Sequence, residues 1–238
     1  MASVVQLAHQ FNSFGFAVLR DELTNSEAVS EAIQKALAIN GRCLAPGTRR
    51  TVFNLFDMYP ELAPLFVTRE VVRVAEEVLG GRVDLLGSEA NALAGNSLWH
   101  SDSHYETASF VKVSCYLSEL GAHTGALRIY PFSNNKNRAW FESEGSAIVN
   151  HSERLGLDLD SVPCFVTTTR LGDVLLFNPN ALHASHAPNC ARLQVSYLLA
   201  RLDGDVQHRH EVAQKVLRRH VTERFVPLIA NSGGTPYD

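Results

Sequence analysis

The segment SLWHSDSHYE, residues 97–106, places His100, Asp102 and His104 at every second position. Alternate side chains of an extended strand point the same way, so we expect these three to share one face. Imidazole and carboxylate groups bind metals and also transfer protons, so a metal site, an acid–base cluster and a plain polar strand edge are all open. The chain has 10 histidines, and one His-x-Asp pair is therefore not decisive by itself.

A second polar group follows an apolar run in GDVLLFNPNALHASHAPNCARLQVSY, residues 172–197, which contains His183, Ser185, His186 and Arg192. His183 and His186 are three positions apart, so on an extended chain they point to opposite faces. Only one of them can then reach an ion that His100 and Asp102 share. Ser185 lies on the same face as His183, which favours His183.

Arg192 begins a strand whose polar face contrasts with an apolar face of Leu193, Val195, Tyr197 and Leu199. A buried arginine requires an anionic partner, so either this face meets solvent or it lines a barrel interior that holds an anionic ligand. Two histidines and one carboxylate form the 2-His-1-carboxylate iron site, which keeps positions open for a co-substrate and oxygen. Arginine is the residue best suited to binding a carboxylate through two hydrogen bonds.

The elements that must position these residues change from helix to strand along the chain. Apolar spacing predicts helices over residues 24–41 and 68–80, begun by Thr24 and Thr68 and ended by glycine. From about residue 82 the period becomes two, which indicates strands. The predicted strands are FVKVSCYLSEL, GALRIYPFS, FVTTTR, GDVLLFN and RLQVSYLLARL, with an earlier one at GFAVLR. Residues 133–162 give no clear pattern.

This order predicts a mainly β protein, a barrel or two-sheet jelly roll supported by helices. We expect one domain over residues 1–238, with helical support over roughly 1–81, a jelly-roll core over roughly 82–202 and a C-terminal helix over roughly 205–221.

Composition narrows the classes of partner. The net charge of −4 and the lack of a basic run argue against nucleic acid. The 4 cysteines form no C-x-x-C pair, which argues against structural disulfides and a thiolate zinc site. No apolar stretch is long enough to span a membrane, and no signal peptide is visible at the start. We therefore expect a cytoplasmic protein that acts on a small molecule, in an oligomeric state that the sequence does not indicate.

Several segments together resemble the phytanoyl-CoA dioxygenase (PhyH) family. These are FNSFGFAVLRDELTNSEA, LWHSDSHYE, LSELGAHTGALRIYPFSN and the segment 172–197, so the resemblance covers most of the chain. It implies a double-stranded β-helix core and an oxygenase that depends on Fe(II) and 2-oxoglutarate. The sequence departs from the family pattern at Phe132, where glycine is usual, and at Asn134, where histidine often follows.

The resemblance assigns roles to individual residues. His100, Asp102 and His183 would bind the iron, and the family's His-x-Ser pattern selects His183 over His186. Arg192 would bind the distal carboxylate of 2-oxoglutarate, assisted by Ser185. The implied reaction uses O2, converts 2-oxoglutarate to succinate and carbon dioxide, and hydroxylates a small-molecule metabolite. Desaturation and cyclisation remain alternatives to hydroxylation.

Further residues have weaker assignments. Asn91 lies on the strand before the His-x-Asp pair, where it would hydrogen-bond the co-substrate, and we expect the substrate near His104, Trp99, Tyr105 and Arg128. Arg49 and Arg50 are interpreted as solvated charges between helices. Two other functions stay open: a cupin-like isomerase or hydrolase with another divalent metal, and a binding protein on a degenerate oxygenase fold. Arg192 favours the oxygenase, because the isomerase and the hydrolase do not bind 2-oxoglutarate.

Overall fold

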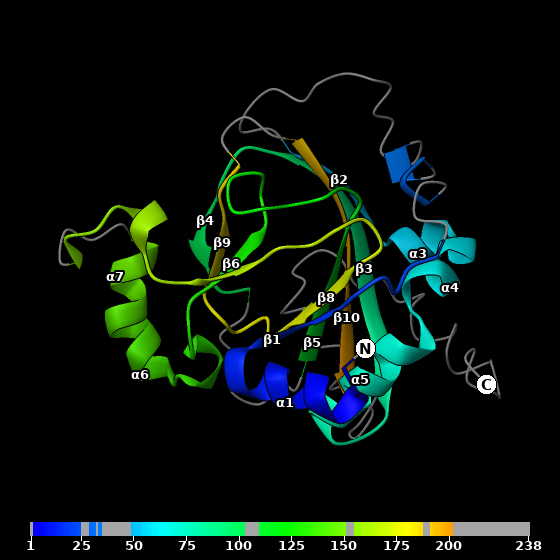
Figure 1. The fold of residues 1–238 in the computed structure, drawn as a ribbon, viewed down its shortest axis with the longest axis horizontal. Helices are drawn as coiled ribbons and strands as arrows, with labels where there is room; N and C mark the ends of the chain where they lie inside the picture. Colours follow the sequence, from blue (N-terminus) through cyan, green and yellow to red (C-terminus); the bar gives the residue numbers. More distant parts are fainter. Residues whose placement is uncertain are drawn as a thin grey trace.

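The computed structural model describes residues 2–24, 29–31, 33–34, 49–102, 110–150, 155–187 and 191–201. Two antiparallel sheets face each other in it, as Figure 1 shows. The larger has the order β1 (Phe16–Leu19), β8 (Val174–Phe177), β5 (Phe110–Tyr116), β10 (Ala191–Arg201), β3 (Val83–Ala94) and β2 (Arg49–Phe53). The smaller has the order β4 (Ser97–His100), β9 (His183–Ser185), β6 (Leu127–Ile129) and β7 (Phe165–Thr167). The jelly-roll prediction is confirmed.

Six of these strands, β1, β5, β6, β7, β8 and β10, lie where the period of two and the apolar runs predict them. β2 was not anticipated, because its sequence RRTVF begins with two arginines and has only a short apolar part. It forms the edge of the larger sheet, paired with β3 from Arg49 opposite Leu93 to Phe53 opposite Glu89. Arg49 therefore lies on a strand rather than in a linker between helices.

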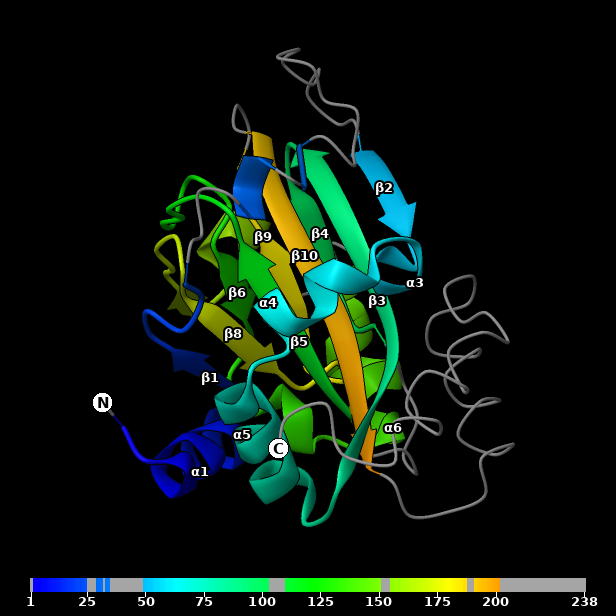
Figure 2. The ribbon, with the colours of Figure 1, turned by 90° about the vertical axis from the view of Figure 1, so that its right-hand side faces the viewer.

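Helices cover the outer face of the larger sheet, as Figure 2 shows for α3 (Leu55–Met58) and α4 (Ala63–Phe66) in front of β3 and β10. This layer also contains α1 (Val4–Phe14), the short 3-10 helix η1 (Pro60–Leu62) and α5 (Arg69–Leu79). α5 confirms its prediction, because the Thr68 hydroxyl accepts a hydrogen bond from the Val71 amide and Gly80 ends the helix at a φ of 67°. Val71, Val74 and Ala75 of α5 pack against the apolar face of the sheet.

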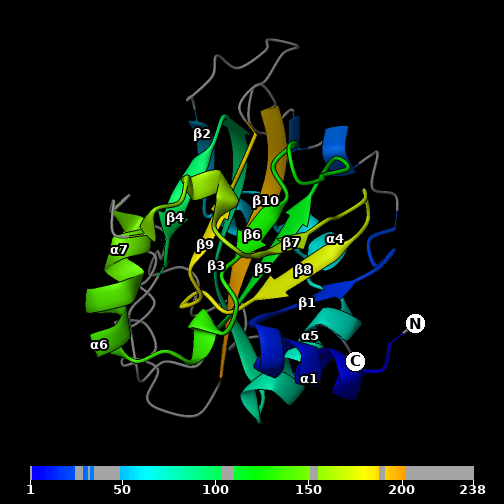
Figure 3. The same cartoon turned by 60° about the vertical axis from the view of Figure 1, so that its left-hand side comes forward.

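A second group of short helices covers the outer face of the smaller sheet, beside β4 in Figure 3. It consists of α6 (Arg138–Trp140), η3 (Phe141–Gly145) and α7 (Ser146–Val149), with η2 (Ser133–Asn135) before it and η5 (Leu159–Ser161) after it. Ile148 of α7 packs there against Trp99 and Leu182. The described part of residues 133–162, which gave no clear sequence pattern, therefore contributes short helices to an outer layer and does not lie between the two sheets.

The face-to-face sheets enclose an interior that is partly apolar and partly polar. Tyr116, Leu127, Ile129 and Phe177 form an apolar cluster within it. β5 and β10 each send one set of side chains outward to the helices and the alternate set inward, as their period of two requires.

Two predicted helices fall largely or wholly outside the described residues. Of residues 24–41, the structure describes 24, 29–31 and 33–34, and among these Val29 and Ile33 are buried in the main core, as the predicted apolar stripe requires. The predicted C-terminal helix at 205–221 lies outside the described residues. Within the part of the chain that is described, none of the helices has the length and apolar character that a membrane crossing needs.

Candidate metal centre and co-substrate site

His100, Asp102 and His183 converge at one point between the sheets. β4 pairs with β9 so that His100 lies opposite His183, and the backbone amide of Asp102, two residues after His100, donates to the Pro179 carbonyl at 2.9 Å. Each of the three side chains offers one ligand atom, and these atoms lie within 4.8 Å of one another. The pairing of two short strands thus brings together residues that are 83 positions apart in the sequence.

The backbone orients both imidazole rings toward the carboxylate. Nδ1 of His100 is 2.7 Å from the Leu98 carbonyl, and Nδ1 of His183 is 2.8 Å from the Ala181 carbonyl. A carbonyl oxygen can only accept, so each Nδ1 is the donor and each Nε2 keeps its lone pair. The Nε2 atoms lie 3.6 Å and 3.7 Å from the two oxygens of Asp102, respectively. This arrangement of two imidazole nitrogens and one carboxylate fits a divalent iron ion.

The surroundings shift the pKa values of all three side chains. Burial lowers the pKa of His183 to about 4, despite the opposing charge of Asp102, so this imidazole is neutral at neutral pH. Burial also acts to lower the pKa of His100, but the hydrogen bond and charge of Asp102 outweigh it and raise that pKa. Burial acts to raise the pKa of Asp102, whereas Lys112 and the histidines hold it well below its usual value. Asp102 is therefore a carboxylate.

Lys112 of β5 touches this group directly. Its Nζ lies 2.7 Å from Oδ2 of Asp102, and both side chains are only 21% exposed. The same Nζ lies 5.8 Å from the centre of the Phe177 ring, which allows a weak cation–π attraction. An ammonium group therefore lies beside the carboxylate of the candidate iron site.

A buried guanidinium borders the same cavity. A cavity of about 270 Å³ is lined by the three candidate ligands and also by Arg192 and Ser185. Arg192 donates to the Gly95 carbonyl at 2.9 Å and to the Ser185 hydroxyl at 2.5 Å, and these two bonds hold its guanidinium at the cavity wall. The predicted pairing of Arg192 and Ser185 at one site is thus present in the structure.

Gly125 makes room for Arg192. Its φ is +105°, which L side chains rarely adopt, and a Cβ built on it would lie 2.7 Å from Cδ of Arg192. Gly125 precedes β6 in the GALRIY segment, so the glycine of that segment is needed for the close approach of the arginine. This requirement was not visible from the sequence, because Arg192 lies 67 positions further along.

Asn91 lies in the cavity wall, on β3, as expected. Its Oδ1 accepts from Nε of Arg49 at 3.0 Å and from the Thr51 hydroxyl at 2.7 Å. Gln194 follows Arg192 on the same face of β10 and donates to the Ser114 hydroxyl at 2.8 Å. The larger sheet therefore lines the cavity with a polar layer, and of the two alternatives for the Arg192 face, solvent or interior, the structure has the interior.

The turn after β6 supports the strand that carries His183. The Ser133 hydroxyl donates to the Tyr130 carbonyl at 2.8 Å and accepts from the Leu182 amide at 2.9 Å, next to His183. Phe132, where the PhyH pattern has glycine, has a φ of 59° and an exposed side chain. This left-handed conformation explains why glycine suits the position and why phenylalanine is strained there.

The structure does not bring Trp99 and Arg128 to the cavity. Trp99 points to the outer face of the smaller sheet and packs with Ile148 and Leu182. Arg128 is buried on the outer face of β6 and donates to the carbonyls of Ala122 and Asp160. Both follow from alternation, since their neighbours His100 and Leu127 line the cavity.

His186 is placed apart from His183, as their spacing predicts. Its Nδ1 lies 2.9 Å from Oδ1 of Asp160, and its ring packs against His123. His104 and Tyr105 lie outside the described residues, so their predicted place near the substrate stays a prediction.

Three charged residues of the cavity were not assigned to the site from the sequence, namely Arg49, Glu89 and Lys112. Lys112 carries the same signal that singles out Arg192, a charge on the polar side of an apolar strand. Glu89 gives the same signal more weakly on β3. Arg49 gives none, because the edge strand that carries it has little apolar character.

Comparisons with known proteins agree with this geometry. The family model for phytanoyl-CoA dioxygenase (PhyH) matches residues 11–191. No curated protein matches the chain in sequence. Among solved structures, the fold is similar to the non-heme alpha ketoglutarate dependent epimerase SnoN from nogalamycin biosynthesis, with a TM-score of 0.65, 15% identity and 83% of each chain covered.

Two further solved structures have the same fold. EctD from S. alaskensis with bound Fe has a TM-score of 0.61 and 20% identity, with 82% of this chain and 75% of that chain covered. HygX from Streptomyces hygroscopicus, with nickel and 2-oxoglutarate bound, has a TM-score of 0.62 and 17% identity, with 83% and 86% covered.

Proposed function

Because the chain belongs to the phytanoyl-CoA dioxygenase (PhyH) family, we propose that it is an Fe(II)- and 2-oxoglutarate-dependent oxygenase that hydroxylates a small-molecule metabolite. The observation that carries this proposal is one cavity lined by both the His100–Asp102–His183 triad and the buried Arg192. Structures of similar fold hold iron, or nickel together with 2-oxoglutarate, which supports the same assignment.

The residues of the chain have distinct tasks in this proposal. His100, Asp102 and His183 would hold the iron, which when bound supplies the redox chemistry that couples O2 and 2-oxoglutarate to substrate oxidation. Arg192 binds the distal carboxylate of 2-oxoglutarate through charge-assisted hydrogen bonds, and Ser185 holds the guanidinium in place. The backbone carbonyls of Leu98 and Ala181 fix both imidazole rings, so the ligand nitrogens need no rearrangement on binding.

Hydroxylation is the reaction that we propose within this class. An aspartate at position 102 supports it, because related halogenases carry glycine or alanine there and leave a site for halide. Solved structures of this fold include an epimerase and a carbocyclase, so the mass of the product must distinguish hydroxylation from epimerisation and cyclisation. A hydroxylated product is heavier than the substrate by one oxygen atom, a cyclised one is lighter by two hydrogens, and an epimer has the same mass.

The rival function is that of an isomerase or hydrolase with the same three ligands and another divalent metal. Arg192 argues against it, because its buried charge borders the metal cavity and has no task in such an enzyme. We further propose a cytoplasmic location, consistent with the free thiols of Cys115 and Cys164.

Anaerobic titration tests the proposal. Purified protein with Fe(II) and 2-oxoglutarate should give the weak visible charge-transfer band of that chelate, and on admission of air should form succinate slowly without substrate. Arg128→Ala serves as a control that removes a buried cavity-remote arginine and should keep the band. Tight zinc binding, with neither the band nor succinate, would favour the rival function.

A further inference from the structure

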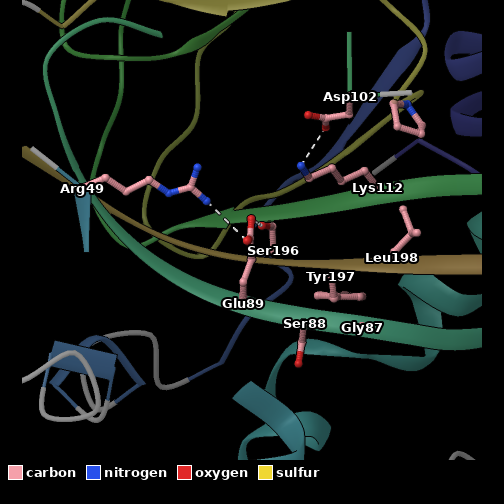
Figure 4. Close-up of a pocket in the computed structure, with 10 residues that line it drawn as sticks. Arg49, Gly87, Ser88, Glu89, Asp102, Lys112, Ser196, Tyr197 and Leu198 are labelled. Carbon is pink, nitrogen blue, oxygen red and sulfur yellow. Dashed lines mark hydrogen bonds and ion pairs between the residues drawn. The ribbon is translucent and has the colours of Figure 1, made fainter. Parts of the chain in front are cut away.

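A smaller cavity of about 170 Å³ adjoins the candidate iron site, and Figure 4 shows its lining. It shares Arg49, Glu89, Asp102 and Lys112 with the larger cavity, while Arg192 and both histidines line only the larger one. The smaller cavity therefore has access to the metal through Asp102 but lies apart from the guanidinium that binds 2-oxoglutarate. This is the position of a substrate beside its co-substrate.

The charged groups of the smaller cavity form two ion pairs. Lys112 pairs with Asp102 at 2.7 Å, and Nη2 of Arg49 lies 3.4 Å from Oε2 of Glu89. Glu89 also accepts from the Ser196 hydroxyl at 2.9 Å, which fixes it on the floor between β3 and β10. In Figure 4 Arg49 and Lys112 reach in from opposite sides, with Glu89 between them. Without a metal, the two positive and two negative charges balance.

Metal binding breaks this balance at Lys112. A divalent ion at the triad takes the charge of Asp102, which is the partner of Lys112 at hydrogen-bond distance. The Arg49–Glu89 pair is unchanged by the metal. Lys112, with only 21% of its side chain exposed, then loses its hydrogen-bonded counter-charge, while Glu89, which also attracts it, is already paired with Arg49. A partly buried ammonium group in this position is stabilised by a new anion.

The size and polarity of the smaller cavity restrict that anion. Sites for drug-sized ligands are about 300–1,000 Å³, so a cavity of about 170 Å³ suits a small metabolite. The distal carboxylate of 2-oxoglutarate already has Arg192, which lines only the larger cavity, and its other carboxylate would be held by the metal. The remaining anion is therefore a group of the substrate.

Resting on the proposed function, we propose that the smaller cavity is the substrate subsite, that the substrate is a small carboxylic acid of about amino-acid size, and that its carboxylate binds Lys112. The Arg49–Glu89 pair faces the other end of the substrate, where it offers both a donor and an acceptor to a polar group. Lys112 is thus a specificity residue: it selects for a carboxylate and holds the acid beside the metal.

Equilibrium binding to the inert Ni(II)·2-oxoglutarate form tests this without turnover. The probes are the L-amino acids and their 2-hydroxy acid analogues, each paired with the carboxamide that keeps its shape and lacks its charge, measured by calorimetry. We expect at least one acid to bind about 10- to 100-fold more tightly than its amide, the difference that a hydrogen bond between charged groups makes. Lys112→Gln should remove this preference, and Lys112→Arg should keep most of it.

Lys136→Gln is the matched control, because Lys136 is exposed and lies over the Trp140 ring on the outer layer. It should keep the preference for the acid. Equal binding of acids and amides to the unaltered protein, or no binding of any probe, would overturn the proposal. So would a Lys112→Gln variant that loses Ni(II) or 2-oxoglutarate but keeps the preference, since Lys112 would then only position Asp102. If the unaltered protein itself binds neither Ni(II) nor 2-oxoglutarate, the proposed function fails instead.

Discussion

The smaller and the larger sheet supply the cavity with different chemistry in different ways. The smaller sheet supplies His100 and His183 from two paired strands, and backbone carbonyls two residues earlier hold each ring. The larger sheet supplies Arg49, Glu89 and Lys112, whose charged ends reach inward on longer side chains. Ligand positions on the smaller sheet are thus set by the backbone, whereas the charges of the larger sheet are set by ion pairs, of Arg49 with Glu89 and of Lys112 with Asp102.

In the proposed function, the smaller sheet supplies ligands for the metal and the larger sheet supplies the charges that select the substrate. A metal site needs ligand atoms at fixed distances, which side chains held by the backbone provide because their rings cannot turn freely. A substrate site needs charges whose partners can be exchanged, which ion pairs on flexible stems provide. Arg192 combines the two, because it comes from β10 of the larger sheet but is held by Ser185 of the smaller. Substitutions on the two sheets should therefore affect metal binding and ligand binding separately.

The largest effect is expected at the smaller sheet. His183→Ala removes one of three metal ligands and should weaken Fe(II) or Ni(II) binding by more than about 100-fold, since even the loss of an outer partner weakens binding by 10- to 100-fold. His186→Ala is the control and should leave metal affinity nearly unchanged, because His186 pairs with Asp160 outside the cavity. Anaerobic metal titration measures both. The reverse result would show that His186, and not His183, is the metal ligand.

Arg192→Lys should weaken the binding of 2-oxoglutarate and leave metal binding unchanged. Lysine keeps the charge but cannot bind a carboxylate through two hydrogen bonds, so we expect the KM for 2-oxoglutarate to rise by about 10- to 100-fold. Metal affinity should stay within about twofold, because Arg192 supplies no ligand atom to the metal group and hydrogen-bonds to Gly95 and Ser185. Equal losses of metal and 2-oxoglutarate affinity would show that Arg192 is structural and that the two sheets are not separable.

Gly125→Ala should produce a weaker form of the same defect. The new Cβ would lie 2.7 Å from Cδ of Arg192, so the guanidinium must shift, and the φ of +105° adds strain of about 1–2 kcal/mol. We expect the KM for 2-oxoglutarate to rise by about 3- to 10-fold with metal affinity retained. Gly156→Ala, at a φ of +56° with nothing near its Cβ, is the control for backbone strain. A like change of KM in both variants would show that strain alone is responsible.

The smallest effect is expected outside both ligand groups, at Phe132. Phe132→Gly relieves the left-handed conformation but adds entropy to the unfolded chain, so we expect a gain in stability of at most about 1 kcal/mol. The melting temperature should rise slightly, with unchanged affinity for metal and 2-oxoglutarate. A loss of metal affinity would show that the exposed phenyl ring helps Ser133 to hold the strand of His183.

Local sequence patterns are enough to predict most of the strands that carry the chemistry and the direction in which some of their side chains point. Alternation on extended segments indicates that His183 and His186 face opposite ways and that Arg192 lies on a polar face, and both predictions agree with the structure. The apolar spacing of residues 68–80 and the threonine and glycine at its ends predict α5 to within a residue. These signals are local, so a single stretch of chain contains them.

The face of each strand that meets the cavity, and the charges that come together there, depend on how the two sheets pack. Trp99 and Arg128 lie on strands beside the site, but they point to the outer layer, because the facing of a strand depends on where the second sheet packs. Arg49, Glu89 and Lys112 come from β2, β3 and β5 of the larger sheet and meet near Asp102 through the pairing of these strands with one another and with β10. Such contacts join residues far apart in sequence, and their energy appears only when the sheets close on one another.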